Sequence, residues 1–181
     1  PMHALLSMYK FFEGWLMEPG AIDFEEFAFE HFLARQAPGG YWHHLVTWLS
    51  QRKNSQVLLL CYEQLQQSFE PALERIAAFM AINLDEELTQ IVQRQSSLSF
   101  MQQHGSHFDD HFLQLKRNPV MDLPLQSSSS KVASEESRAS RPQPSKKLIA
   151  AMQARWDEEV RPVTGLADYS DVTREAINTV E

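Results

Sequence analysis

The residues best suited to chemistry follow an apolar run. The segment VLLLCYEQL (57–65) holds five apolar residues and then changes abruptly to Tyr62-Glu63. A short apolar block without alternation is typical of a parallel strand that is covered on both faces. Ligands bind beyond the carboxyl ends of such strands. We therefore expect the phenol of Tyr62 and the carboxylate of Glu63 at a ligand site.

A second group of reactive side chains lies in the segment from Gln103 to His111, which contains three histidines and two aspartates. Imidazole and carboxylate groups ligate metals, but the segment lacks the helical pair of histidines seen in HExxH sites. A metal-dependent hydrolase that uses His104 to His111 is therefore an alternative, and we expect no metal. The only cysteine, Cys61, lies inside the apolar run, where we expect a small core residue rather than a nucleophile.

A third feature is the stretch from about 122 to 147, which is rich in serine and proline and reads as a mobile loop. Within it, residues 131–147 carry five basic and two acidic side chains, a net charge of +3. Such a segment suits a lid over an anionic ligand. A solvated linker explains the same composition equally well.

Apolar residues at helical spacing predict the elements around these groups. We expect helices over 2–16, from Asp23 (a capping box with Glu26), after Gly39-Gly40, from about Asp85 and from Leu148, and another with Pro71 near its start. The last helix should carry Ile149, Met152, Trp156 and Val160 on one stripe and stop at Arg161-Pro162. The helix with Pro71 near its start would be the crossover that packs back on a parallel sheet.

Size and charge limit the class of protein. The 181 residues suit one domain, 1–181, and no segment is apolar for long enough to span a membrane. The net charge of −8 argues against nucleic-acid binding. The absence of an Asn-x-Ser/Thr sequon favours a cytoplasmic protein. The chain begins at Pro1 inside a helical pattern, so we expect a truncated amino terminus.

Six short segments in a fixed order resemble the carboxy-terminal two-thirds of cytosolic-type sulfotransferases, which use 3′-phosphoadenosine-5′-phosphosulfate (PAPS). They are PMHALLSMYKFF (1–12), GGYWHHL (39–45), LLLCYEQL (58–65), SSLSFM (96–101), SSKV (129–132) and ARWDEEV (154–160). The resemblance implies a helix-rich α/β fold, a three-layer sandwich with a parallel sheet like that of P-loop NTPases. The first strand and the phosphate loop would be missing.

The resemblance also implies roles for individual residues. Ser7 matches the serine that holds the 3′-phosphate of the nucleotide. A hydroxyl near the start of a helix suits this role, because the free N–H groups and the dipole there attract a phosphate. Tyr62 matches the tyrosine that contacts adenine, in a Tyr-Glu-Asp motif whose third position here is Gln64. Phe100 matches a phenylalanine on the same base, and Leu98 replaces the usual threonine or serine.

The 3′-phosphate clamp departs most from the family pattern. Where relatives carry Arg-Lys-Gly, this chain has Ala133-Ser134-Glu135 after Lys131-Val132, and the glutamate should repel a phosphate. Arg138 and Arg141 are the candidates to substitute for it.

Two further residues, Phe11 and His43, match the region that borders the acceptor pocket, although surface or core placement also explains His43.

Sulfuryl transfer needs donors at the leaving 5′-phosphate and a base for the acceptor's proton. In the family these are a Lys in a strand–loop–helix and a His, both upstream of the segment that matches Pro1. The 181 residues contain no glycine-rich phosphate loop. We therefore expect part of a sulfotransferase acting on a small hydroxyl or amine acceptor, inactive alone. A noncatalytic interaction protein on a degenerate scaffold is the alternative.

Overall fold

The computed structural model describes residues 1–34, 40–109, 111–123, 131–132 and 140–178. These residues form two compact units, each built from two separate stretches of the chain. The first unit comprises Pro1–Ala28 and Glu86–Pro144, and the second comprises Phe29–Asp85 and Ser145–Glu181. No helix within the described residues is both long and apolar enough to cross a bilayer. That all 181 residues form one domain stays a prediction.

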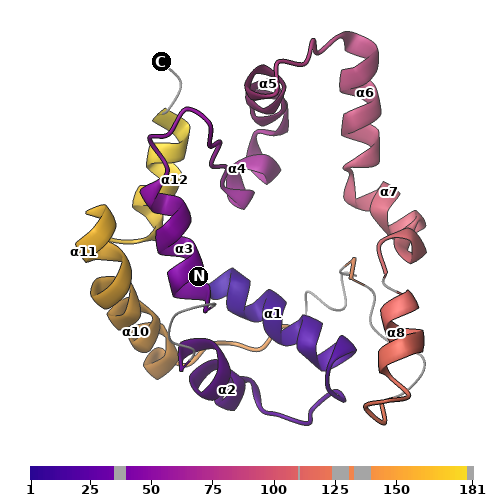
Figure 1. The fold of residues 1–181 in the computed structure, drawn as a ribbon, viewed down its shortest axis with the longest axis vertical. Helices are drawn as coiled ribbons and strands as arrows, with labels where there is room; N and C mark the ends of the chain where they lie inside the picture. Colours follow the sequence, from indigo (N-terminus) through magenta and orange to yellow (C-terminus); the bar gives the residue numbers. More distant parts are fainter. Residues whose placement is uncertain (35–39, 110, 124–130, 133–139, 179–181) are drawn as a thin grey trace. The chain divides into compact units, whose positions relative to one another are not determined.

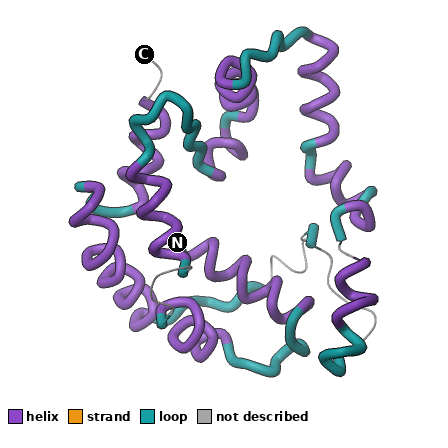
Figure 2. The backbone as a smooth tube through the Cα atoms, viewed as in Figure 1, coloured by secondary structure: helices purple, strands orange, loops and turns teal. Residues whose placement is uncertain are grey.

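The predicted strand is not formed, although helix α4 (Tyr62–Gln67) begins directly after the apolar run, where the ligand site was expected. Residues 57–60 are irregular, and Cys61 is extended, with φ −96° and ψ 134°. Figure 2 accordingly draws helices and loops but no strand in the described part of the chain. A strand needs a hydrogen-bonded neighbour, and no other described segment pairs with residues 57–60. The family's parallel sheet is therefore not seen in the described residues of this chain.

The first unit is organised around helix α1 (Met2–Trp15), the helix predicted over 2–16 (Figure 1). Its buried Tyr9 meets the rings of Phe24 and Phe27 edge-on, with centroids 5.3 and 5.4 Å apart. Both phenylalanines lie on α2 (Phe24–Phe27), which opens as predicted at Asp23, whose carboxylate accepts from the Glu25 amide at 2.8 Å.

The rest of the first unit is a series of short helices. They are α6 (Glu86–Gln95), α7 (Leu98–Gln103), the 3₁₀ turn η2 (Gly105–His107) and α8 (His111–Arg117). The helix expected from about Asp85 is therefore confirmed. Arg117, at the end of α8, donates to the Trp15 carbonyl and so joins α8 to the end of α1.

The second unit buries one aromatic and aliphatic core. Its elements are η1 (Ala28–Leu33), α3 (Tyr41–Ser50), α4, α5 (Phe69–Phe79), α10 (Lys146–Arg155), η3 (Trp156–Val160), α11 (Arg161–Thr164) and α12 (Tyr169–Asn178). Helix α3 packs on η3 and α11, and Trp42, Leu148 and Val160 are among the fully buried side chains of this unit. The predicted helices after Gly39-Gly40 and around Pro71 are confirmed as α3 and α5.

The helix expected to stop at Arg161-Pro162 instead continues to Thr164 (Figure 1). Its last turns pass through a π-helical segment, η3, in which the Arg161 amide reaches back five residues to the Trp156 carbonyl. This wider turn precedes Pro162, which then lies in the first turn of α11, where its missing N–H costs little. The helix ends at Gly165, whose φ of +77° suits glycine.

The start of this helix also differs from the expectation. Helix α10 begins at Lys146, two residues before Leu148, because the Ser145 hydroxyl caps it by accepting from the Leu148 amide at 3.1 Å. Ile149 is 52% exposed and Leu148 is buried in its place, so the buried stripe runs through Leu148, Met152, Trp156 and Val160. The boundary moved because a capping serine, rather than the first apolar residue, starts the helix.

Candidate functional site

Tyr62 is the first residue of α4 and lies directly after the extended Cys61. Its side chain is 61% exposed, and its hydroxyl accepts a hydrogen bond from Gln66 Nε2 at 2.9 Å, one helical turn away. The ring is therefore held at its polar end and is largely exposed to solvent. An exposed aromatic face with a polar tip is suited to contact with a purine base.

Glu63 belongs to a cluster with two partly buried phenols and the buried thiol of Cys61. The Tyr169 hydroxyl, from α12, donates to Glu63 Oε2 at 3.1 Å. Burial, followed by the nearby Glu63 charge, raises the pKa of Tyr41 to about 12. Burial and then the charges of Cys61 and Glu63 also raise the pKa of Tyr169. Both phenols are therefore neutral near pH 7, so they can donate hydrogen bonds but cannot act as bases.

Cys61 belongs to the same cluster and is 4% exposed. Burial, and to a lesser extent the charge of Glu63, raises the pKa of its thiol, although a hydrogen bond with Tyr169 and the charge of Arg75 act in the opposite direction. A protonated thiol is a poor nucleophile. The prediction that Cys61 is a core residue is confirmed by its burial.

Gln64, at the third position of the tyrosine motif, connects α4 to α12. Its Nε2 donates to the Thr173 carbonyl at 2.9 Å, while its Oε1 is buried without a hydrogen-bond partner among the described residues. The amide thus holds two helices together where the family pattern has a carboxylate.

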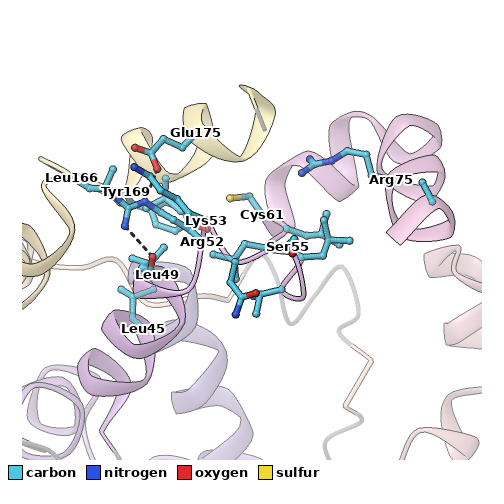
Figure 3. A pocket seen from close by; sticks show the side chains of 17 residues that line it. Leu45, Leu49, Arg52, Lys53, Ser55, Cys61, Arg75, Leu166, Tyr169 and Glu175 are labelled. Carbon is cyan, nitrogen blue, oxygen red and sulfur yellow. Dashed lines mark hydrogen bonds and ion pairs between the residues drawn. The ribbon is translucent and has the colours of Figure 1, made fainter. Parts of the chain in front are cut away.

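A cavity of about 830 Å³ lies within the second unit (Figure 3). Its walls come from the end of α3, residues 52–61, α5 and α12. In Figure 3 the Arg75 side chain extends from α5 toward Cys61, in agreement with its effect on the thiol pKa. The apolar run predicted as a strand is thus one wall of this cavity.

Ser7 and Phe11 lie one turn apart on α1, and both are exposed. The Phe11 ring is nearly parallel to that of Trp15, with centroids 6.1 Å apart and an interplanar angle of 12°. Lys131 Nζ lies 4.8 Å from the Trp15 ring centroid, at cation–π distance. The first unit thus brings the end of the SSKV segment onto the helix that carries Ser7 and Phe11.

Phe100 and Leu98 both lie on α7 and are partly buried. The Phe100 ring packs against His104, with centroids 4.3 Å apart, and His104 is in turn 5.7 Å from His107. His104 and His107 therefore belong to an aromatic stack. Among the described side chains, no three His, Cys, Asp or Glu residues gather as a metal site requires.

The remaining predicted residues are His43, Arg138 and Arg141. His43 is an exposed residue of α3, and Arg141 is exposed just before α10. Arg138 and the segment Ala133-Ser134-Glu135 lie outside the described residues. The structure pairs Ser7 with Phe11 on α1 and Leu98 with Phe100 on α7, whereas Tyr62 and His43 belong to the second unit.

Sequence reasoning missed three residues that surround the tyrosine motif: Tyr41, Arg75 and Tyr169. Tyr169 lies 106 residues from its partner Glu63, so no local spacing could reveal the pair. Tyr41 was visible in the sequence only as part of the GGYWHHL segment (39–45), with no role of its own.

Comparison with known proteins gives a family for this sequence. The family model described as "Sulfotransferase domain" matches residues 1–160. A curated mouse protein, Sulfotransferase 1 family member D1 (Mus musculus), is 29% identical over 103 residues, 56% of this chain and 35% of the relative. The 3-alpha-hydroxysteroid sulfotransferase of Cavia porcellus is 31% identical over 105 residues, 58% of this chain and 36% of the relative.

A human relative, Sulfotransferase 1E1 (Homo sapiens), is 28% identical over 121 residues, 64% of this chain and 41% of its own length. The chain therefore spans roughly two-fifths or less of the length of these relatives. No solved structure gives a significant match. Since the family model covers most of the chain, the protein belongs to the sulfotransferase domain family.

Proposed function

We propose that this chain carries the adenine side and part of the 3′-phosphate side of a PAPS site, in a sulfotransferase that acts on a hydroxyl or amine of a small molecule. The observation that carries the proposal is the position of Tyr62, an exposed ring at the head of α4 in a chain of this family. Its hydroxyl is held by Gln66, so little freedom is lost when a base stacks on the ring.

Other residues of the chain would supply the phosphate contacts. Ser7 offers an exposed hydroxyl on α1, and Phe11 borders the acceptor on the same helix. Arg138 and Arg141 would supply the positive charge that the Ala133-Ser134-Glu135 segment lacks. Bidentate guanidinium groups suit a phosphate dianion, which supports arginine in this role. Phe100 would pack on the base, and Leu98 would leave one polar contact unmade.

The chemical step would require the Lys and the His that the family carries upstream of the segment that residues 1–12 resemble. In-line transfer of a sulfuryl group develops charge on the leaving 5′-phosphate and frees a proton from the acceptor. The phenols nearest the tyrosine motif, Tyr41 and Tyr169, have raised pKa values and would not accept that proton. We propose that the chain alone does not turn over, and turnover above background by purified chain would refute this.

The experiment is a calorimetric titration of the chain with 3′-phosphoadenosine 5′-phosphate. If Tyr62 stacks on adenine, Tyr62→Ala should weaken binding by about 1–3 kcal/mol, roughly 5- to 150-fold. Tyr62→Phe keeps the ring and should weaken binding less. Trp48→Ala is the matched control, because Trp48 is a large exposed aromatic residue of α3 in the same unit. Equal affinities for Tyr62→Ala and the parent would refute the adenine role.

The noncatalytic alternative has a different outcome in the same titration. An interaction protein on a degenerate scaffold would bind no nucleotide, even at millimolar concentration, while folding normally by circular dichroism. The cytoplasmic location inferred from the absent sequons is part of the proposal, and fractionation of cells that express the whole protein would test it.

A further inference from the structure

The cavity of the second unit has a long aliphatic wall. Its apolar lining comes mainly from the run Val57–Leu60, together with Leu45 and Leu49 of α3 and Val172 of α12. Its volume of about 830 Å³ lies within the range of small-molecule sites, roughly 300–1,000 Å³. An elongated apolar ligand is the kind that such a wall favours.

The charged residues that line the cavity are three bases and one acid, Arg52, Lys53, Arg75 and Glu175, a net charge of +2. The net charge of the whole chain is −8, so the lining of this cavity is locally positive in an acidic protein. Positive groups at an apolar site favour an anionic ligand over a neutral one.

Two of the three bases are already engaged. Arg52 Nε pairs with Glu175 Oε2 at 2.8 Å, and its Nη2 donates to the Thr164 carbonyl, also at 2.8 Å. Arg75 extends toward Cys61, as Figure 3 shows. Arg52 therefore connects the end of α3 to α11 and α12.

Lys53 differs from the two arginines. It is exposed, and it forms no hydrogen bond or ion pair with another described residue. Beside it, Ser55 adds an exposed hydroxyl to the cavity lining. One ammonium and one hydroxyl next to an aliphatic wall match a single anionic head group on an apolar chain.

We propose that this cavity binds a long-chain carboxylate, with its hydrocarbon chain along Val57–Leu60 and its carboxylate at Lys53 and Ser55. This site is separate from the proposed nucleotide contacts, because Tyr62 does not line the cavity. It needs no part of the sulfuryl-transfer machinery.

The test is a calorimetric titration of the chain with dodecanoate, below its micelle concentration, and with dodecanol. We expect saturable 1:1 binding of dodecanoate, and weaker binding of dodecanol. Lys53→Gln should weaken dodecanoate about fivefold, the effect of an exposed ion pair worth about 1 kcal/mol, and leave dodecanol unchanged. Lys146→Gln is the matched control, an exposed lysine of the same unit that does not line the cavity.

A second variant tests the location without depending on charge. Ala78 is an exposed cavity-lining residue of α5, so Ala78→Trp should fill the cavity without unfolding the helix, and should abolish dodecanoate binding. The proposal is overturned if neither probe binds, if Ala78→Trp still binds, or if dodecanol equals dodecanoate and Lys53→Gln has no effect. A titration that saturates only with an extended apolar peptide would also overturn it. None of these outcomes bears on nucleotide binding through Tyr62.

Discussion

The hydroxyl of Tyr169 donates a hydrogen bond to the Glu63 carboxylate at 3.1 Å, although the two residues are 106 positions apart. This bond joins the first turn of α12 to the first turn of α4, the helix that begins with Tyr62. A second bond, from Gln64 Nε2 to the Thr173 carbonyl, joins the same helices. The position of the proposed adenine contact therefore depends on the carboxy-terminal helix.

Tyr169→Phe should destabilise the second unit, because it removes a partly buried hydrogen bond to a carboxylate. We expect the free energy of unfolding to fall by about 1–2 kcal/mol, measured by urea denaturation. Tyr62→Phe is the matched control: it removes the same group from an exposed hydrogen bond and should cost less than about 0.5 kcal/mol. Equal losses in the two variants would contradict the structural role of Tyr169.

The unfolding free energy of the chain should fall at alkaline pH, because the pKa of Tyr41 is raised in the folded state. Tyr41 has a pKa of about 12 in the folded state, against 10.0 for an unperturbed tyrosine in the unfolded state. Between pH 10 and pH 12 it therefore keeps its proton only when the chain is folded. Since the unfolded state then binds fewer protons, stability is complete below pH 10 and falls as pH rises toward 12.

The raised pKa of Tyr169 adds to this loss in the same direction. Tyr41→Phe should therefore flatten the decline of the unfolding free energy above pH 10, which urea titrations at several pH values would measure. A parent and a Tyr41→Phe variant with identical alkaline slopes would show that Tyr41 ionises normally.

Gly165→Ala should destabilise the end of α11. Gly165 has a φ of +77°, and an added Cβ would meet no atom within 4 Å, so the cost is backbone strain alone. We expect a loss of about 1–2 kcal/mol in unfolding free energy. Gly165→Asn, which tolerates the left-handed region better, should lose less. An alanine variant as stable as the parent would contradict the left-handed cap.

Substitution of Arg138 and Arg141 by alanine should weaken binding of 3′-phosphoadenosine 5′-phosphate if these arginines replace the missing clamp. Removal of each guanidinium–phosphate hydrogen bond should weaken binding by about 1–3 kcal/mol. Lys146→Gln, at the start of α10, controls for the general loss of positive charge nearby. Unchanged affinity in the double arginine variant would dispose of this role.

The helices with strong apolar periodicity were predictable from the sequence, as α1, α3 and α5 demonstrate. The conformation of Val57–Cys61 was not, because an apolar block indicates burial but a strand depends on a neighbouring strand. The π-helical segment Trp156–Val160 has no sequence signal of its own, so Pro162 was read as a stop.

The candidate site was predictable only where residues are close in sequence. Tyr62 and Gln66 lie one helical turn apart. The motif Tyr62-Glu63-Gln64 was enough to predict the position of the candidate adenine contact. The interactions of Tyr169, Tyr41 and Arg75 with the Glu63 cluster connect distant segments. Helix α12 was not among the predicted helices, although Tyr169, Val172 and Ala176 recur in it at helical spacing.

The central claim is that this chain recognises the adenine and the 3′-phosphate of a sulfotransferase nucleotide. The most direct measurement compares the affinity of the chain for 3′-phosphoadenosine 5′-phosphate with that for adenosine 5′-monophosphate, by calorimetry at fixed salt. We predict tighter binding of the 3′-phosphorylated nucleotide by about tenfold or more, the effect of one charge-assisted hydrogen bond of about 1.4 kcal/mol. Equal affinity for the two nucleotides, or no binding of either at millimolar concentration, would contradict the claim.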